Sequence, residues 1–245
     1  MLLGMLASGN INPTLIVIVI LVALMAMTVH EYAHARMATW WGDDTPRLLG
    51  RLTLNPAVHI NWMGFLMFVL VGFGILGSVP INVRRMRDPR WGSFWTSFAG
   101  PLSNLALAVV FALIYRVLIL MDISFLSGGL LGLLVTFIYY SILFNLLLFA
   151  FNLLPFFPID GWHMVLAVLP GNWLARHQVP PFIAQNMRPI ARFLQEPAFQ
   201  WQRWAQLSQI VLLVLVFLSL AQIGISPLNA LIWGPVGFLL GILVG

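Results

Sequence analysis

A long uncharged segment of this chain leads directly into the pattern His-Glu-Tyr-Ala-His at residues 30–34. Residues 14–27 contain no charged side chain and consist mostly of Ile, Val, Leu, Ala and Met. Such a run predicts a membrane-spanning helix, on which His30 lies ~24 Å beyond Thr14 at a rise of ~1.5 Å per residue. Ionisable side chains at that depth cost several kcal/mol, so their presence by default indicates a functional site.

The spacing of these residues gives the site a chemistry. Positions four apart share one face of a helix, so His30 and His34 can bind the same metal ion. Glu31 lies beside that face, where its carboxylate can act as a general base toward water. The alternative is a chance match, or two histidines hydrogen-bonded in a protein core. A random match in a chain with five His and two Glu has a probability of roughly one in a thousand, which favours metal binding.

Composition restricts both the class of protein and the choice of metal ligands. The chain is 61% hydrophobic and only 8% charged, which predicts an integral membrane protein in a lipid bilayer. It contains no cysteine, so the ligands must be His, Asp or Glu. All 12 basic residues are arginines, and most lie in loops rather than in a cluster of the kind that binds nucleic acid. No nucleic-acid partner is therefore expected.

The apolar segments predict an all-α polytopic fold with about six transmembrane helices around a buried metal site. The expected segments are residues 14–40, 62–79, 94–121, 130–154, 207–223 and 228–244, with a short helix over 162–169. We expect a single integral membrane domain over 1–245, with its core at about 14–170 and a C-terminal part, 171–245, formed by an amphipathic loop and two apolar helices.

Two segments after the first helix leave alternatives open. Residues 47–61 look strand-like, because polar and apolar residues alternate around Arg51. Residues 62–79 contain four glycines and could either span the membrane or enter and return. The loop at 80–91 carries four arginines, which by the positive-inside rule predicts a cytoplasmic location.

Two histidines leave a tetrahedral metal site incomplete, so a third ligand is expected elsewhere. Asp160 is the candidate, because the other acidic residues apart from Glu31 lie in predicted loops or at helix boundaries. It follows a segment broken by Pro155 and Pro158, which must line a cavity if it lies at membrane depth. Asp160 could also cap the short helix that follows it, and the two roles can coexist.

Taken together, four motifs resemble the site-2 protease family of intramembrane zinc metalloproteases. The first is the His-Glu-x-x-His pattern, and the second is the run Asn152, Pro155, Ile159, Asp160 and Gly161, which departs from the family only by Ile in place of Leu. The segments 50–56 and 99–104 resemble bacterial and archaeal members. The matches follow the family order from residue 30 to residue 161, and no motif identifies the remainder.

The resemblance implies a role for each of these residues. His30, His34 and Asp160 would bind one Zn²⁺ per chain, and Glu31 would be the general base. Asn152 would bind the substrate backbone or help to hold the oxyanion, although it could instead cap a helix or join two helices. His59, expected at the interface, and His163 are weaker candidates for additional ligands.

The family also implies an activity and a location. The expected protein is a multi-pass zinc metalloendopeptidase in the cell membrane of a bacterium or archaeon. It would hydrolyse peptide bonds within or near transmembrane segments of membrane-protein substrates, as in regulated intramembrane proteolysis. The alternatives are a metal-ion transporter and a scaffold that binds membrane proteins without cutting them. The sequence shows neither the internal repeats nor the several intramembrane carboxylates that are typical of transporters.

Overall fold

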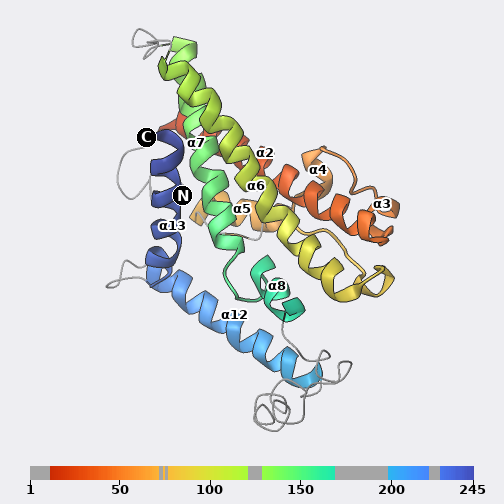
Figure 1. The fold of residues 1–245 in the computed structure, drawn as a ribbon. Coiled ribbons are helices and arrows are strands. Elements are labelled where there is room, and N and C mark those ends of the chain that lie inside the picture. Colours follow the sequence, from red (N-terminus) through yellow and green to blue (C-terminus); the bar gives the residue numbers. More distant parts are fainter. Residues whose placement is uncertain (1–11, 72–73, 75–76, 121–128, 169–197, 221–226) are drawn as a thin grey trace.

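The computed structural model describes residues 12–71, 74, 77–120, 129–168, 198–220 and 227–245. Apart from one isolated antiparallel bridge, the regular structure in these residues is helical, as predicted. The helices are α2 (Pro13–Trp41), α3 (Thr45–Leu48), α4 (Pro56–His59), α5 (Trp62–Val71), the 3-10 helix η1 (Val83–Arg85), α6 (Pro89–Leu120), α7 (Gly129–Asn152), α8 (Asp160–Val168), α12 (Ala198–Leu220) and α13 (Pro227–Val244). Figure 1 shows α6 and α7 side by side, with α2 crossing them and α13 beside α7.

Local sequence signals determine where the first long helix begins and ends. The side chain of Asn12 accepts a hydrogen bond from the Leu15 backbone N–H at 3.1 Å, and Pro13 occupies the first turn, where its missing N–H is not needed. At the other end Gly42 adopts φ 106°, and its N–H donates to the Thr39 carbonyl at 3.0 Å. The observed helix matches the predicted segment 14–40 to within one residue at each end.

Rows of buried residues pack α2 against α6. Buried residues recur at every fourth position along α2 (Val22, Ala26, His30, His34 and Ala38) and along the first half of α6 (Thr96, Gly100 and Asn104). Rows with this spacing interdigitate when two helices cross, and small residues such as Ala and Gly allow a close approach. The two histidines therefore lie at the helix interface rather than toward lipid.

An apolar core joins α6, α7 and α13. Its buried members are Ala108, Ala112, Ile138, Ile142, Leu146, Ala150 and Val236. Arg116, near the end of α6, donates hydrogen bonds to the carbonyl oxygens of Leu243 at 2.7 Å and Ile242 at 2.5 Å. Because these carbonyls belong to the last turn of α13, the guanidinium group holds the ends of α6 and α13 together.

The length of the apolar helices partly confirms the predicted membrane topology. Three helices, α2, α6 and α7, are long and apolar enough to cross a bilayer. The apolar parts of α5, α12 and α13 among the described residues have 10 to 17 residues. The chain is thus an integral membrane protein by the length and composition of its helices, and the total of six spans stays a prediction.

The described residues bear on the two alternatives for 62–79. Helix α5 has 10 residues, which cover ~15 Å, about half of the ~30 Å hydrocarbon core. Ile60 and Gly77 form an antiparallel bridge, so the two ends of this segment lie side by side. A segment whose ends meet returns to the side from which it started, which favours the re-entrant alternative over a span.

The strand-like structure predicted for 47–61 is not confirmed. The structure has the short helices α3 and α4 there, and only Ile60 takes part in a bridge. The Asn55 side chain accepts from the Ala57 N–H at 3.0 Å and starts α4, while the Arg51 guanidinium donates to the Val58 carbonyl. The polar residues of the alternating pattern thus stabilise a helical turn instead of a strand.

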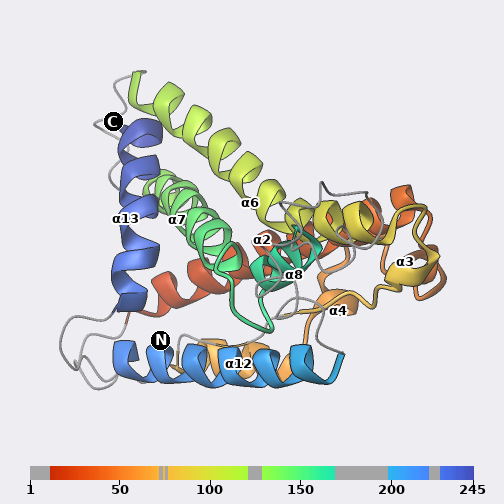
Figure 2. The same ribbon diagram turned by 60° about the horizontal axis from the view of Figure 1, so that its bottom comes forward.

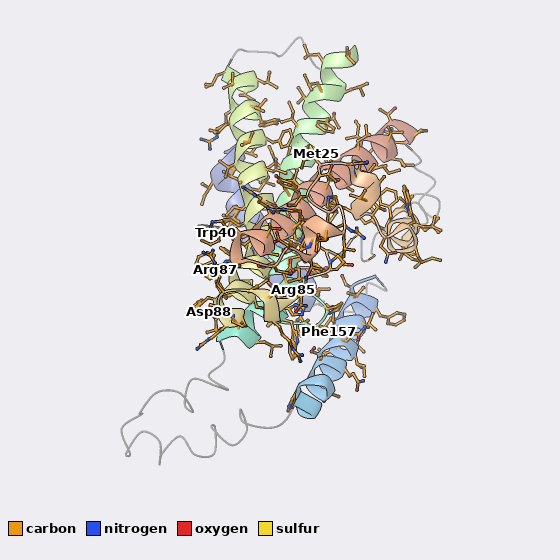
Figure 3. The ribbon with its side chains drawn as sticks, turned by 90° about the vertical axis from the view of Figure 1, so that its right-hand side faces the viewer. Met25, Trp40, Arg85, Arg87, Asp88 and Phe157 are labelled. Carbon is orange, nitrogen blue, oxygen red and sulfur yellow. The ribbon has the colours of Figure 1, made fainter. Side chains whose placement is uncertain are left out.

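The arginine-rich loop between η1 and α6 packs against the end of α2. Arg87 donates a hydrogen bond to the Trp40 carbonyl at 2.7 Å, and its guanidinium carbon lies 5.4 Å from the centre of the Trp40 ring. Figure 3 shows these two side chains at the same end of the molecule. The loop is therefore part of the folded body.

Helix α8 is anchored at its C-terminus by α6. The Arg90 side chain donates to the carbonyl oxygens of Ala167 at 2.6 Å and Val168 at 2.8 Å, which are free at the end of a helix. Beyond α8, most of the predicted amphipathic segment lies outside the described residues, which resume with α12. Figure 2 shows α12 lying across the ends of the other helices, on the side where α8 lies. The Ser208 hydroxyl of α12 accepts from the Phe157 N–H at 3.1 Å, just before α8.

Candidate metal centre

Three predicted ligand residues from distant parts of the chain meet at one point. The Nε2 atoms of His30 and His34 on α2 are 2.9 Å apart, and each lies 3.2 Å from Oδ2 of Asp160 at the start of α8. Ligand atoms around a tetrahedral zinc ion with bonds of ~2.0 Å are separated by ~3.3 Å. The observed separations are therefore close to those that such an ion requires.

The hydrogen bonds of the two imidazole rings determine which nitrogen atoms face this point. His30 Nδ1 lies 2.7 Å from Oδ1 of Asn104, and His34 Nδ1 lies 2.6 Å from the Thr96 carbonyl oxygen. Both partners are acceptors, so each Nδ1 carries the hydrogen and each Nε2 presents a lone pair. Oδ2 of Asp160 accepts no hydrogen bond within the described part of the chain. Three electron-pair donors thus converge without a proton between them, an arrangement that suits a metal cation.

Asp160 is held in an ionised state by its surroundings. Burial acts to raise the pKa of this carboxyl, but whenever the His34 and His30 imidazoles carry a proton on Nε2 their positive charge outweighs burial and the pKa lies well below its ordinary value. The carboxylate is the form that binds a metal ion. The residue after it, Gly161, approaches the end of α7 so closely that a Cβ atom would collide with the carbonyl groups of Leu153 and Leu154. A glycine is therefore required to bring Asp160 to the two histidines.

Helix α6 supports both imidazole rings along one row of residues. Thr96 and Asn104 provide the acceptors for His34 and His30, and Gly100 lies midway between them in sequence. A Cβ atom on Gly100 would collide with Nε2 of His34 and would lie 2.7 Å from Cε1 of His30. The absence of a side chain at position 100 thus lets α6 pack directly on the two histidines.

Glu31 is buried beside the ligands and is not one of them. Its side chain is on the neighbouring face of α2, and its Oε2 atom has no hydrogen-bond partner among the residues that the structure describes. A Cβ atom on Gly77 would lie 3.1 Å from Oε1 of Glu31, so the end of the segment 62–79 passes over this carboxylate.

The centre opens into a cavity of about 660 Å³. Glu31, His30, His34, Asp160, Asn152 and His163 line it together with apolar residues that include Met27, Phe68, Phe144, Leu147, Phe151, Leu212 and Ile232. Its walls come from α2, α5, α6, α7, α8, α12 and α13 as well as from the extended segment after Gly77. The three ligand atoms thus face a cavity that has both polar and apolar walls.

The remaining candidates occupy different positions. Asn152 lines the cavity at the end of α7 and donates to the Leu148 carbonyl of its own helix at 2.9 Å. His163 lines the cavity but lies outside the group of three ligands. His59 also lies outside this group: its side chain is buried, and its Nε2 lies 2.7 Å from the Thr53 carbonyl oxygen.

Some residues of the site were not identified from the sequence. Asn104 belongs to the segment 99–104 that resembles the family, but its bond to His30 becomes apparent only once α6 is placed against α2. The contact of His34 with Thr96 uses a backbone carbonyl, which no residue pattern reveals. Gln209 of α12 lines the cavity from a segment that carries no recognisable motif.

Comparisons with known proteins agree with this arrangement. The chain is 36% identical over 157 residues to "Putative zinc metalloprotease YwhC" of Bacillus subtilis, which covers 64% of this chain and 71% of the relative. It is 32% identical over 117 residues to "Putative zinc metalloprotease Rip2" of Mycolicibacterium smegmatis, and there the match spans less than half of either protein, 44% of this chain and 45% of the relative. No solved structure gives a significant match. The model of peptidase family M50, the site-2 protease family, matches residues 15–194, and the chain therefore belongs to this family.

Proposed function

We propose that the protein is an intramembrane zinc metalloprotease that hydrolyses peptide bonds within or near transmembrane segments of membrane proteins. The observation that carries this proposal is the convergence of His30, His34 and Asp160 beside the carboxylate of Glu31, in a cavity between apolar helices. In this proposal the three ligands hold one Zn²⁺ per chain. The family and the names of the two relatives support the same chemistry.

Each group at the centre has a task in hydrolysis. Zinc, when bound, acts as a Lewis acid and lowers the pKa of water to about 7. Glu31 takes a proton from the attacking water while the oxygen of that water bonds to the carbonyl carbon of the peptide. When the C–N bond breaks, the same carboxyl passes that proton to the leaving nitrogen. The unpartnered Oε2 of Glu31 favours this role, because no described residue competes for it.

The shape of the cavity suits an unwound segment of a transmembrane helix. A helical substrate uses its carbonyl groups in its own hydrogen bonds, so it must open locally before it can react. The extended residues Ser78, Val79 and Ile81 line the cavity and can pair with such a segment by β-addition. In this proposal Asn152, which lines the cavity, binds the substrate backbone or the oxyanion, and the apolar walls accept the side chains of the substrate.

The rest of the chain fits one protease domain. We assign residues 1–245 to a single integral membrane domain whose catalytic core is about 14–170. Both relatives come from bacteria, which supports a bacterial cell membrane as the location. In this proposal the protein acts in regulated intramembrane proteolysis. The arginine-rich loop beside Trp40 supports a cytoplasmic location for the nearby end of α2.

The proposal is tested with purified protein in liposomes and a panel of single-span substrates. Removal of zinc with a chelator should stop cleavage, and added zinc should restore it. Mass spectrometry of the products should place the cut within or next to the transmembrane segment. Zinc-independent cleavage would contradict the proposal. Zinc flux without cleavage would favour a transporter, and substrate binding without cleavage would favour a scaffold.

A further inference from the structure

Two asparagines without any exposed surface lie between the helices that build the metal centre. Asn104 belongs to α6 and Asn145 to α7, and both side chains are 0% exposed. A buried amide in an apolar bundle is costly unless its donors and acceptors are used, so the partners of these two residues are informative. Nothing in the sequence motifs involves Asn145.

The two amides form a continuous chain of hydrogen bonds that ends at a metal ligand. The Nδ2 atom of Asn145 donates to the Ser141 carbonyl oxygen at 2.8 Å, one turn earlier in α7. The Nδ2 atom of Asn104 donates to Oδ1 of Asn145 at 2.8 Å and lies 3.3 Å from the Ala26 carbonyl oxygen. Oδ1 of Asn104 then accepts from Nδ1 of His30, at 2.7 Å.

The direction of every hydrogen bond in this series is determined by the Ser141 carbonyl, at the end farthest from His30. A backbone carbonyl only accepts, so the amide nitrogen of Asn145 must face Ser141 and its oxygen must face Asn104. The Asn145 oxygen and the Ala26 carbonyl both accept from Nδ2 of Asn104. The nitrogen of Asn104 therefore faces away from His30, and its oxygen faces His30. An accepting oxygen there requires a hydrogen on Nδ1 of His30. Its Nε2 lone pair is thereby left for the metal.

We propose that Asn145 is a positioning residue of the metal centre, which selects the metal-binding tautomer of His30 through Asn104. This inference rests on the proposed metal site and adds to it a residue on a third helix. The other histidine needs no such relay, because the Thr96 carbonyl of α6 holds His34 directly. Helix α7 leads into the segment that carries Asp160. The series of hydrogen bonds therefore also connects His30 with the helix that precedes Asp160.

The test is zinc affinity, measured by competition with a chelator in detergent. Asn145→Leu should weaken zinc binding about 10- to 100-fold, the usual effect of losing an outer hydrogen bond of a ligand. Asn145→Ser is a second variant, because a serine hydroxyl can bond to the Ser141 carbonyl of its own helix without leaving a buried polar group unpaired. It should show a similar loss even if the leucine variant does not fold.

Two controls separate positioning from general packing. Ser141→Ala removes a hydroxyl that, among the described residues, bonds to the Phe137 carbonyl of α7, and it keeps the carbonyl that Asn145 needs. It should change zinc affinity less than about twofold. Asn104→Leu should weaken binding as strongly as the Asn145 variants. Adding Asn145→Ser to it should cause no further loss, since both residues act through one contact.

The outcomes distinguish this inference from the proposed function. Wild-type affinity in both Asn145 variants would overturn the role of Asn145 and leave the metal site intact. Additive losses in the double variant would overturn the relay, because they would show that Asn145 acts independently of Asn104. A wild-type protein that binds no zinc would overturn the proposed function, and the inference would fail with it.

Discussion

Glu31→Gln is expected to reduce the rate of peptide cleavage by about 10²–10⁴-fold while zinc stays bound. Glutamine has nearly the same shape as glutamate but cannot take a proton from water. The three ligand residues keep their positions, because none of them hydrogen-bonds to Glu31 in the described structure. The measurement is cleavage of one single-span substrate in liposomes, with the zinc content of each preparation determined in parallel.

A matched carboxylate-to-amide change shows whether the loss is specific. Asp44 is exposed near the end of α2, where it pairs with Arg47 at 3.2 Å, and it does not line the cavity. The Asp44→Asn variant should therefore cleave the substrate at the wild-type rate, since exposed ion pairs contribute little to stability. Equal cleavage by wild type and Glu31→Gln, at equal zinc content, would exclude Glu31 as the base.

Gly100→Ala is expected to weaken zinc binding by about a hundredfold or more, and cleavage with it. In an ordinary helix position this change stabilises the protein by about 1 kcal/mol, because alanine has the higher helix propensity. Here the added Cβ atom would collide with the His34 ring and crowd that of His30. Both rings are held by their Nδ1 hydrogen bonds. The collision can therefore be relieved only if the rings rotate or if α2 and α6 move apart.

The control for this prediction is the same substitution in another helix. Gly237 of α13 has no atom within 4 Å of the position that its Cβ would occupy. Gly237→Ala should leave zinc affinity unchanged, with a melting temperature equal to or above that of wild type. Wild-type zinc affinity in Gly100→Ala would show that α6 does not pack against the histidines as described.

The sequence was sufficient to predict the parts of the fold that depend on local signals. The uncharged run located the first helix to within a residue at each end, where the structure shows the caps Asn12 and Gly42. The ligand residues were also predictable, because a spacing of four defines one helix face and few acidic residues were available as a third ligand. Their convergence is a geometric finding, and their metal binding stays a proposal.

Features that depend on contacts between distant segments could not be predicted. The return of the chain after α5 follows from the pairing of Ile60 with Gly77, which hydrophobicity alone does not encode. Alternation around Arg51 predicts a strand, but the Asn55 cap and the bond from Arg51 to the Val58 carbonyl stabilise a helical turn there instead. The burial of His59 and the link from Asn104 to Asn145 likewise depend on which helices become neighbours.

The central claim is that His30, His34 and Asp160 bind zinc together, and X-ray absorption at the zinc edge tests it most directly. The wild-type spectrum should show two imidazole nitrogens in the first shell, with oxygen completing a coordination number of about four. Asp160→Ala should lose bound zinc or change the oxygen contribution, whereas Glu31→Gln should keep both imidazoles. A first shell of oxygen alone, or one with a single imidazole, would contradict the assignment.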